Sequence, residues 1–482
     1  MTPASSLLSE VSGACGDFGT LIPLLVAMAR GRTIYLAPTL FLSGVVHILT
    51  GLYWDIPMPL QPMKAIASLA IAQELSRIQV TTAGVGIGIC FLLLSIKGAI
   101  DFVNKWIPLA VIGGLQLGVG WKLALKGIHM IQQLPWWFAS SVDCISLAIL
   151  CGLLCLYGLR RKVPSPSNQR QDAMTEEDNE EADETDSTIP EASEISTCQR
   201  LLLHPPVGII LFLLGIILAI IQVTTNNSAD NPNDSATPEP LLVNALRNAT
   251  ASDWRIGLVS GTLTQLPLTT LNSCLSVCML AHTLFPAHNK IQRLSRQSVC
   301  ISIGLVNALL CPLGMMPTCH GAGGLAGQHK LGANTGVSMV LLGVFKMALG
   351  ILACQGSLLR ILDALPASIL GILLVVAGHE LAMTGVVKVA ESSSLNNNNN
   401  NNNNSGRGNG NTDSMSVCLI TALVIVGTGH THVGALSGWI ACVIQGSNGF
   451  SLCGRSGEGN ATSNERSSSR GEYAVIQSEN AA

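Results

Sequence analysis

Charged residues are scarce in this chain: its 482 residues include 26 Lys and Arg and 29 Asp and Glu, or 11% of the total. An ordinary soluble protein carries about 25% charged residues. The net charge of −3 and the pI near 6.4 give no basic footprint, whereas a nucleic-acid-binding domain typically has a pI above about 9. With 48% hydrophobic residues and a mean hydropathy of +0.45, the composition predicts a polytopic membrane protein and no nucleic-acid partner.

Motifs for bond chemistry are also lacking. The sequence has no Walker motif, no HExxH and no nucleophile elbow, which argues against an ATP-driven pump and an enzyme. Its fifteen cysteines include no CxxC pair, and Cys151/Cys155 and Cys274/Cys278 share helix faces without His partners for zinc. The pair of histidines in 430–432 has no third ligand nearby. We therefore expect neither a metal nor a cofactor, and interpret the cysteines as small apolar packing residues.

Long apolar runs, by contrast, recur along the chain. A spanning helix needs about 20 mostly apolar residues, and no basic segment of the kind that starts a signal peptide precedes the first run. We predict an all-α fold with fourteen spans, the third and tenth short and broken, near 11–30, 34–52, 57–75, 79–98, 104–124, 140–159, 205–223, 256–282, 297–315, 317–330, 335–354, 361–382, 415–429 and 430–446.

Basic residues and glycosylation sequons agree on the orientation. With the N-terminus in the cytoplasm, sixteen Lys and Arg residues lie inside and eight outside, while Lys64 and Lys346 fall within spans. The loop at 224–254 is then lumenal, as its three sequons require. Another sequon, at Asn460, falls in the cytoplasmic tail and is interpreted as a chance match. The lumenal sequons are Asn226, Asn233 and Asn248.

Polar segments divide the membrane domain. Eleven of the 29 acidic residues lie between Asp172 and Glu194, and a run of asparagines fills 396–404; both compositions are typical of disorder. We predict a tail (1–10), a first membrane part (11–162), an acidic disordered cytoplasmic loop (163–204), the seventh span (205–223), the lumenal loop (224–254), a second membrane half (255–446) with an Asn-rich loop (391–414), and a disordered cytoplasmic tail (447–482).

The two broken spans mark the predicted binding site. With seven spans per half they occupy corresponding positions, which is typical of transporters built from inverted repeats. In the third span, Pro62 suits a first helical position, so a half-helix would begin near the membrane centre beside Gln61 and Lys64. Its free N–H groups and positive dipole end favour an anion. Alternatively, Lys64 snorkels or pairs with an acid such as Asp17.

The tenth span carries glycines where the third has prolines. Thr318 can cap a following half-helix, and Gly321, Gly323 and Gly324 let backbone approach a ligand closely. His320 is interpreted either as a donor to an oxyanion or as a core histidine bonded to a backbone carbonyl.

The first and eighth spans supply further polar candidates. Asp17, near Thr20, is interpreted as a proton-coupling carboxylate, a partner for Lys64 or a helix cap. Gln265 and Asn272 are neutral donors suited to an oxyanion, or alternatively to helix–helix hydrogen bonds.

Four sequence blocks resemble the eukaryotic molybdate transporter family, distant relatives of the sulfate permeases. The likeness extends over roughly 11–446 and omits the acidic loop, the lumenal loop and the asparagine run. Sulfate permeases usually end in a soluble regulatory domain, and the roughly 36 residues after the last predicted span are too few for one. The blocks are Gly16–Pro23, Pro57–Ala67, Gln265–Ser273 and Met316–Gln328.

This resemblance implies a seven-plus-seven inverted repeat, a core domain that moves against a gate domain, and high-affinity molybdate uptake. It marks as substrate-binding candidates Asp17, Thr20, Gln61, Met63, Lys64, Gln265, Asn272, His320, Gly321, Gly323 and Gly324.

Transport of an oxyanion across a lipid bilayer is therefore the function we expect, with molybdate as substrate. Residue types alone leave sulfate open as the substrate, and a non-transporting oxyanion sensor that signals through residues 163–200 is the alternative from another class. Proton coupling, a homodimer, and the choice between the plasma membrane and an endomembrane such as the vacuole also stay open.

Overall fold

Helices make up most of the computed structural model, which describes residues 3–14, 18–96, 99–100, 108–137, 143–160, 207–226, 238–286, 288–400 and 410–444. The first half contains α1 (Pro3–Ala14), α2 (Phe18–Arg30), α3 (Leu36–Trp54), β1 (Leu60–Pro62), α4 (Lys64–Gln73), α5 (Arg77–Leu94), α7 (Leu109–Gln132), α8 (Ile145–Arg160) and α11 (Val207–Asn226). The second half contains α12 (Ala251–Ile256), η2 (Gly257–Thr262), α13 (Leu263–Thr269), η3 (Thr270–Ser276), α14 (Val277–Leu284), η4 (Ile291–Arg293), α15 (Arg296–Leu310), β2 (Thr318–His320), α16 (Ala322–Lys330), α17 (Val337–Ala353), α18 (Ser357–Asp363), α19 (Ala367–Asn400), α20 (Gly410–Thr428) and α21 (Thr431–Ile444).

Each of the fourteen expected segments contains a helix, or a strand followed by a short helix. Among the described residues, five helices are long and apolar enough to cross a membrane, and α17 with α18, bent by 92°, would make a sixth. The count of fourteen spans therefore stays a prediction. The five helices are Leu36–Trp54, Arg77–Leu94, Leu109–Gln132, Ala251–Leu284 and Ala367–Val387.

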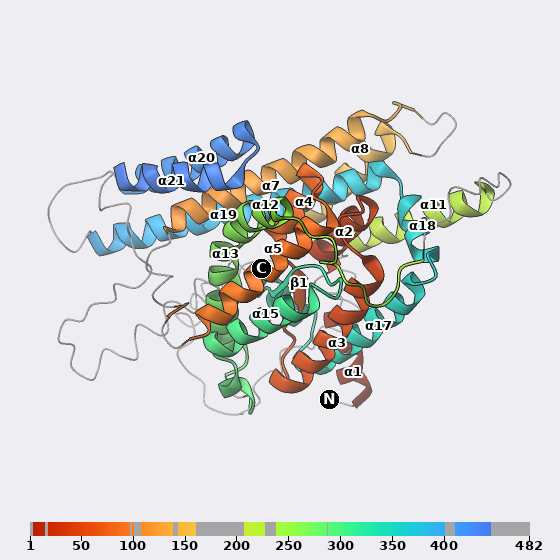
Figure 1. Ribbon diagram of the computed structural model, residues 1–482, viewed down its shortest axis with the longest axis horizontal. Coiled ribbons are helices and arrows are strands. Elements are labelled where there is room, and N and C mark those ends of the chain that lie inside the picture. The colour runs from red at the N-terminus through yellow and green to blue at the C-terminus, as the bar shows by residue number, and fades with distance from the viewer. Residues whose placement is uncertain are drawn as a thin grey trace, which may run out of the picture.

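Four helix pairs pack most extensively: α7 with α19, α3 with α17, α7 with α20, and α5 with α15. In Figure 1, α7, α8, α19, α20 and α21 lie together along the upper edge, while α3, α5, α15 and α17 lie below them around β1. Glycines allow close approach between α7 and α19. A Cβ on Gly120 would lie 2.5 Å from the carbonyl oxygen of Gly378, and a Cβ on Gly378 would lie 2.5 Å from that of Gly120. Such small-residue crossings are typical of membrane helices.

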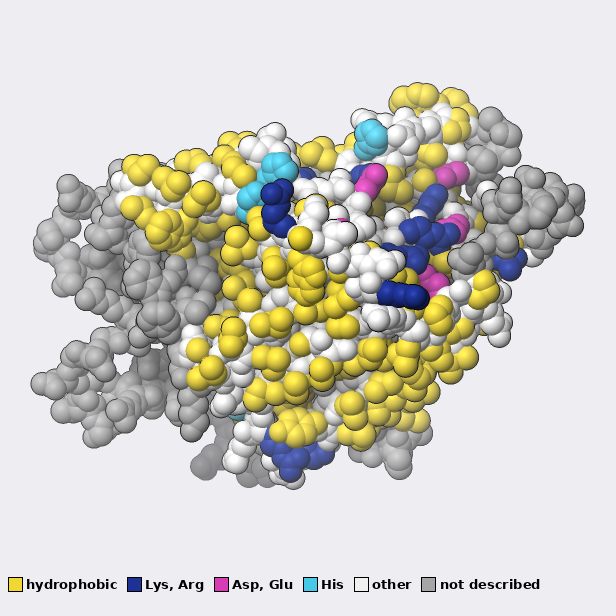
Figure 2. Space-filling model, viewed as in Figure 1, with side chains coloured by type: hydrophobic (Ala, Val, Ile, Leu, Met, Phe, Trp, Pro, Cys, Tyr) yellow, Lys and Arg dark blue, Asp and Glu magenta, His cyan; other side chains and the backbone are white. Residues whose placement is uncertain are grey.

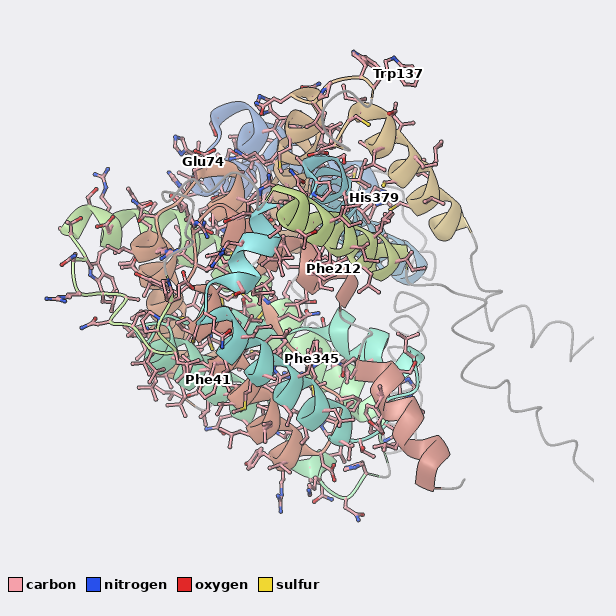
Figure 3. The ribbon with its side chains drawn as sticks, turned by 90° about the vertical axis from the view of Figure 1, so that its right-hand side faces the viewer. Phe41, Glu74, Trp137, Phe212, Phe345 and His379 are labelled. Carbon is pink, nitrogen blue, oxygen red and sulfur yellow. The ribbon has the colours of Figure 1, made fainter. Side chains whose placement is uncertain are left out.

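Apolar side chains cover a broad band of the face shown in Figure 2, and charged side chains gather toward its upper right and its lower edge. In the view of Figure 3, Phe345 of α17 lies in the lower part and Trp137 projects at the top. These two side chains are 53% and 75% exposed. An apolar surface of this extent, bounded by charge, is typical of a protein that faces lipid.

The described loops and ends differ from expectation at two places. Residues 3–10, expected as a tail, belong to α1, which packs on α16 and α17. Helix α19 continues to Asn400, into the segment 391–414 expected as a loop, because extending a formed helix adds a hydrogen bond for each residue. The predicted disordered segments 163–204 and 447–482 lie outside the described residues.

The described part of the expected lumenal loop is anchored to the helices. The carboxylate of Glu239, 8% exposed, accepts hydrogen bonds from the backbone N–H groups of Leu36 (2.7 Å) and Ala37 (3.3 Å) at the start of α3. Arg77 of α5 donates to the same carboxylate at 3.0 Å. A carboxylate at a helix N-terminus complements the helix dipole, so this segment ties α3 to α5.

Candidate functional site

The two segments predicted to be broken meet in an antiparallel pair of short strands. Strand β1 pairs with β2 so that Leu60 lies opposite His320, Gln61 opposite Cys319, and Pro62 opposite Thr318. Each strand leads into a short helix, β1 into α4 and β2 into α16. Residues more than 250 positions apart are thereby brought together at the start of two half-helices.

A buried polar side chain holds each strand. His47 of α3 accepts a hydrogen bond from the backbone N–H of Leu60 at Nε2 (3.1 Å), while its Nδ1 lies 2.6 Å from the carbonyl oxygen of Ser43. Asn307 of α15 binds both backbone groups of Thr318, accepting from its N–H (2.9 Å) and donating to its carbonyl oxygen (2.7 Å). Both side chains are fully buried, so they fix the strands relative to α3 and α15.

Replacing His47 with Leu should lower the free energy of unfolding by about 1–3 kcal/mol, because the buried N–H of Leu60 loses its acceptor. His47→Gln, whose side-chain oxygen can accept the same bond, should recover part of the loss. Thermal unfolding of the purified full chain compares the two variants. Wild-type stability in His47→Leu would contradict this role.

Local details of the two breaks differ from expectation. Pro62 was expected at the first helical position, but it ends β1; Met63 is the N-cap of α4, which begins at Lys64. Thr318 was expected to cap α16, but it lies in β2, and Gly321 is the N-cap. Both differences have the same cause. Pro62 and Thr318 are paired with each other in the two strands, so each helix begins further along the chain.

The eighth expected span contains two π-helical segments, η2 and η3, on either side of α13. Pro267 lies inside α13, and a proline removes one backbone donor and clashes with the preceding turn. The following π-segment η3 carries Asn272 and Ser273. Single turns of π-helix inside α-helices are frequent at functional sites.

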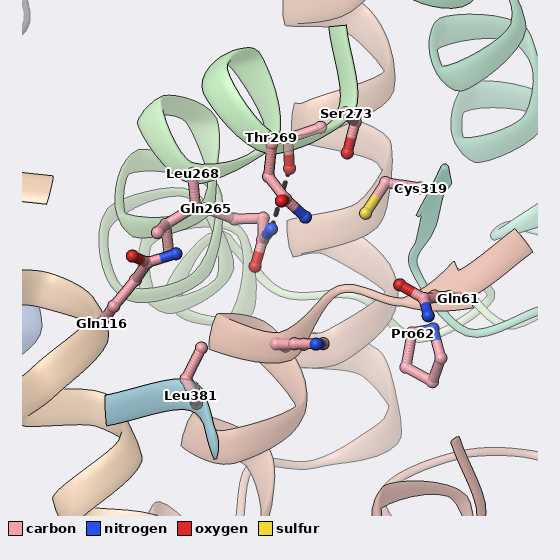
Figure 4. A pocket seen from close by; sticks show the side chains of 11 residues that line it. Gln61, Pro62, Gln116, Gln265, Leu268, Thr269, Ser273, Cys319 and Leu381 are labelled. Atoms are coloured by element: carbon pink, nitrogen blue, oxygen red, sulfur yellow. Dashed lines mark hydrogen bonds between the residues drawn. The ribbon is translucent and has the colours of Figure 1, made fainter. Parts of the chain in front are cut away.

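A small cavity lies where β1, α4, α7, α13, η3, β2 and α19 meet. Four of the predicted residues line it, and Figure 4 shows Gln61, Gln116, Gln265 and Cys319 around it. Among the described lining residues, Lys64 alone carries a charge. The lining consists of Gln61, Pro62, Lys64, Gln116, Gln265, Leu268, Thr269, Asn272, Ser273, Cys319 and Leu381.

Two lining side chains have polar atoms that are buried and unpaired. Within the described part of the chain, neither the hydroxyl of Ser273 nor Oε1 of Gln116 has a hydrogen-bond partner. The two residues are 0% and 4% exposed. Buried polar groups are normally hydrogen-bonded, and a turn of the Gln116 amide by 180° would present its N–H₂ group in the same place. The cavity thus holds polar groups suited to a ligand.

Glutamine side chains cover the beginnings of both half-helices. Oε1 of Gln265 accepts hydrogen bonds from the backbone N–H groups of Ala65 (3.0 Å) and Ile66 (3.3 Å) at the start of α4. Gln61 lies against the start of α16: its Nε2 would be 2.6 Å from a Cβ on Gly324, and its Oε1 would overlap a Cβ on Gly321. Glycine at these two positions therefore makes room for Gln61.

Met63 and His320, which were also predicted, do not line the cavity. His320 is fully buried, 3.0 Å from the hydroxyl of Ser302 and edge-on to Trp54, so it is a core histidine here. Met63 is buried in the main hydrophobic core. Asp17 lies outside the described residues, and Thr20 is in α2 with its side chain not described.

The acidic residue that interacts with Lys64 was not among the predicted site residues. Glu380 of α19, which precedes the lining residue Leu381, interacts electrostatically with Lys64. The predicted alternative partner, Asp17, lies outside the described residues.

The chain matches the family model described as "Molybdate transporter of MFS superfamily" over residues 9–123 and 257–381. It is 35% identical over 393 residues to molybdate transporter 1 of Arabidopsis thaliana, covering 78% of this chain and 80% of that protein. The chain belongs to the molybdate transporter family. Family members similar to it also include molybdate transporter 2 of Arabidopsis thaliana (36% identity, 78% of each chain) and molybdate transporter 1 of Chlamydomonas reinhardtii (32%, covering 78% and 83%).

Solved transporters share the fold of this molybdate transporter family member. The structure of SLC26A9 is similar with a TM-score of 0.55 and 11% identity, covering 92% of this chain and 66% of the SLC26A9 chain. The transmembrane domain of the cyanobacterial bicarbonate transporter BicA gives a TM-score of 0.52 and 13% identity, covering 89% and 97%. With its apolar helices, the chain is an integral, multi-pass membrane protein.

Proposed function

We propose that this protein is a secondary-active transporter of molybdate, which it binds in the cavity between α4 and α16. The observation that carries the proposal is the lining itself: one lysine, three glutamines, an asparagine and two hydroxyl side chains converge where two half-helices begin. The relatives' names supply the substrate, because they are molybdate transporters.

The electrostatics of the cavity suit a dianion. Lys64 supplies the positive charge of the lining, which Glu380 of α19 offsets in part, and the two half-helix N-termini add partial positive charges. Neutral amides and hydroxyls can donate the remaining hydrogen bonds to an oxyanion. A site with one cation and several neutral donors offsets desolvation of the anion without holding it too tightly for release.

Helix packing supports the seven-plus-seven repeat. If each element of the first half corresponds to the one seven spans later, α3 corresponds to α15, α5 to α17, and α7 to α19. The pair α3–α17 then maps onto α15–α5, which is also a packed pair, and α7–α19 and β1–β2 map onto themselves. The corresponding roles of His47 and Asn307 follow the same exchange.

Alternating access requires a core domain of α2–α5 and α12–α17 to move against a gate domain of α7, α8, α11 and α19–α21. Polar contacts join the two domains at the end of α4. Lys126 of α7 binds Glu74 at 2.8 Å, and Gln73 of α4 donates to the carbonyl oxygen of Gly429, between α20 and α21. Lys122 of α7 donates to the same carbonyl at 2.6 Å, within the gate domain. The contacts of Lys126 and Gln73 must exchange for water as the core moves.

Gly321→Ala should raise KM for molybdate uptake about tenfold, because its Cβ pushes Gln61 from the start of α16 and weakens one bond to the anion. Gly427→Ala in α20 is the control, since a Cβ there meets nothing within 4 Å and the residue is not a substrate-binding candidate. Uptake kinetics in vesicles compare the two. Equal effects of both substitutions would count against a role for the Gln61 position.

Accumulation of molybdate in sealed vesicles that contain the purified protein tests the proposal. We expect uptake at nanomolar molybdate that persists in a thousandfold excess of sulfate. Uptake abolished by sulfate would indicate a sulfate carrier. Molybdate binding without accumulation would indicate a sensor.

A further inference from the structure

Gln265 is held at both ends of its amide group. Its Oε1 accepts from the N–H groups of Ala65 and Ile66 at 3.0 and 3.3 Å, and its Nε2 donates to the hydroxyl of Thr269 at 2.8 Å. The side chain is 3% exposed, and Figure 4 shows it in the middle of the cavity lining, bonded to Thr269. The amide oxygen therefore occupies the place at the start of α4 where an oxygen of a bound anion would lie.

The backbone donors of α4 cannot serve Gln265 and an anion at the same time. A neutral amide oxygen makes an ordinary hydrogen bond, whereas a charged oxygen makes a bond roughly twice as strong and gains from the helix dipole. A dianion that enters the cavity can therefore displace Oε1 of Gln265. Displacement leaves the amide on a flexible side chain beside Thr269, so no backbone change is needed.

A second observation points to a ligand in the same place. Among the described residues, the buried Ser273 hydroxyl and Oε1 of Gln116 line this cavity without partners, while the start of α4 is already satisfied. The residues that would complete a ligand's shell are thus left free, and the strongest anion-binding element is covered by an internal acceptor.

We infer that Gln265 is a positioning residue that acts as an internal substitute for the oxyanion, capping α4 whenever substrate is not bound there. The inference rests on the proposed function and adds a consequence for transport. By competing with the substrate, Gln265 lowers affinity, and by satisfying α4 afterwards it speeds release and the return of the unloaded carrier. The same side chain therefore lowers the affinity for substrate and raises the rate of turnover.

The test is the dissociation constant of molybdate for the purified full chain, measured by titration calorimetry, together with KM and maximal uptake rate in vesicles. Gln265→Ala and Gln265→Leu both remove the acceptor, and Leu keeps most of the volume if the Ala variant fails to fold. We expect binding about three- to tenfold tighter, with a lower KM and a lower maximal rate. Gln265→Glu places a permanent carboxylate on α4 and should abolish binding.

Gln132→Ala, on the exposed end of α7, is the control for expression and folding and should match wild type. Weaker binding in both Gln265→Ala and Gln265→Leu would overturn the inference and make Gln265 a direct donor to the anion. Unchanged binding with a lower unfolding temperature would also overturn it, leaving a structural cap. If wild type binds sulfate and not molybdate, the proposed substrate fails, and the same comparison made with sulfate still decides the role of Gln265.

Discussion

Lys64→Ala should reduce molybdate uptake at tracer concentration by about two orders of magnitude, since a hydrogen bond to a charged group contributes about 1.5–3 kcal/mol. Lys64 is the single charged residue among the described residues of the cavity lining. Its loss removes the only full charge that offsets desolvation of the dianion there. Initial rates of uptake in vesicles, normalised to protein content, measure the effect.

Two further variants separate charge from folding. Lys64→Arg keeps the charge but changes the geometry of the donors, so it should retain part of the uptake. Lys290→Ala removes a lysine whose partly exposed ion pair with Asp55 spans 3.3 Å, and surface pairs of this kind contribute little. Normal uptake in Lys64→Ala, at wild-type expression, would refute the role of this residue.

Gly120→Leu should prevent α7 and α19 from packing and leave little folded protein. Even a Cβ at this position would lie 2.5 Å from the carbonyl oxygen of Gly378 and 2.7 Å from the backbone nitrogen of Ala382. These are backbone atoms, which cannot rotate away as a side chain can. Overpacking of a tight core typically costs about 1–3 kcal/mol and occasionally more, and a leucine adds three further carbons at the same crossing.

Gly427→Leu in α20 is the matched control, because a Cβ at Gly427 meets nothing within 4 Å. Size-exclusion chromatography and thermal unfolding in detergent compare the two variants. We expect the control to elute and unfold like wild type. A well-folded Gly120→Leu protein would show that the α7–α19 crossing is not as close as the structure describes.

Local signals in the sequence were sufficient to find the two breaks. The three prolines of 57–62 and the glycines of 321–324 exclude regular helix over short stretches, and each stretch is followed by residues that form one. Isolated polar residues in apolar runs likewise pointed to Gln61, Lys64, Gln265 and Asn272, which the structure places on one cavity. Their roles in binding stay predictions.

The register between distant strands could not be predicted, and it decides which neighbours face the cavity. Because side chains alternate along a strand, pairing Gln61 with Cys319 turns Cys319 toward the cavity and His320 toward Ser302. Sequence reasoning chose His320 for its chemistry. No local pattern distinguishes it from the adjacent cysteine.

Some residues that line the cavity could not be identified from the sequence either. Gln116 lies in a glycine-rich apolar helix, where a lone glutamine also fits a helix–helix hydrogen bond, and its place on the cavity depends on how α7 packs against α4. Thr269 lies four residues after Gln265 and Ser273 directly follows Asn272, and the π-segment η3, which contains Ser273, changes which side chains of this span face the cavity. The capping of α4 by Gln265 likewise requires two segments 200 residues apart.

The central claim is that an oxyanion binds between the starts of α4 and α16, and a structure of the full chain determined with bound molybdate tests it most directly. We predict density for the anion within hydrogen-bonding distance of Lys64 Nζ and the Ser273 hydroxyl, with Gln265 moved off Ala65. Density for molybdate elsewhere in the protein, with this cavity unchanged, would contradict the account.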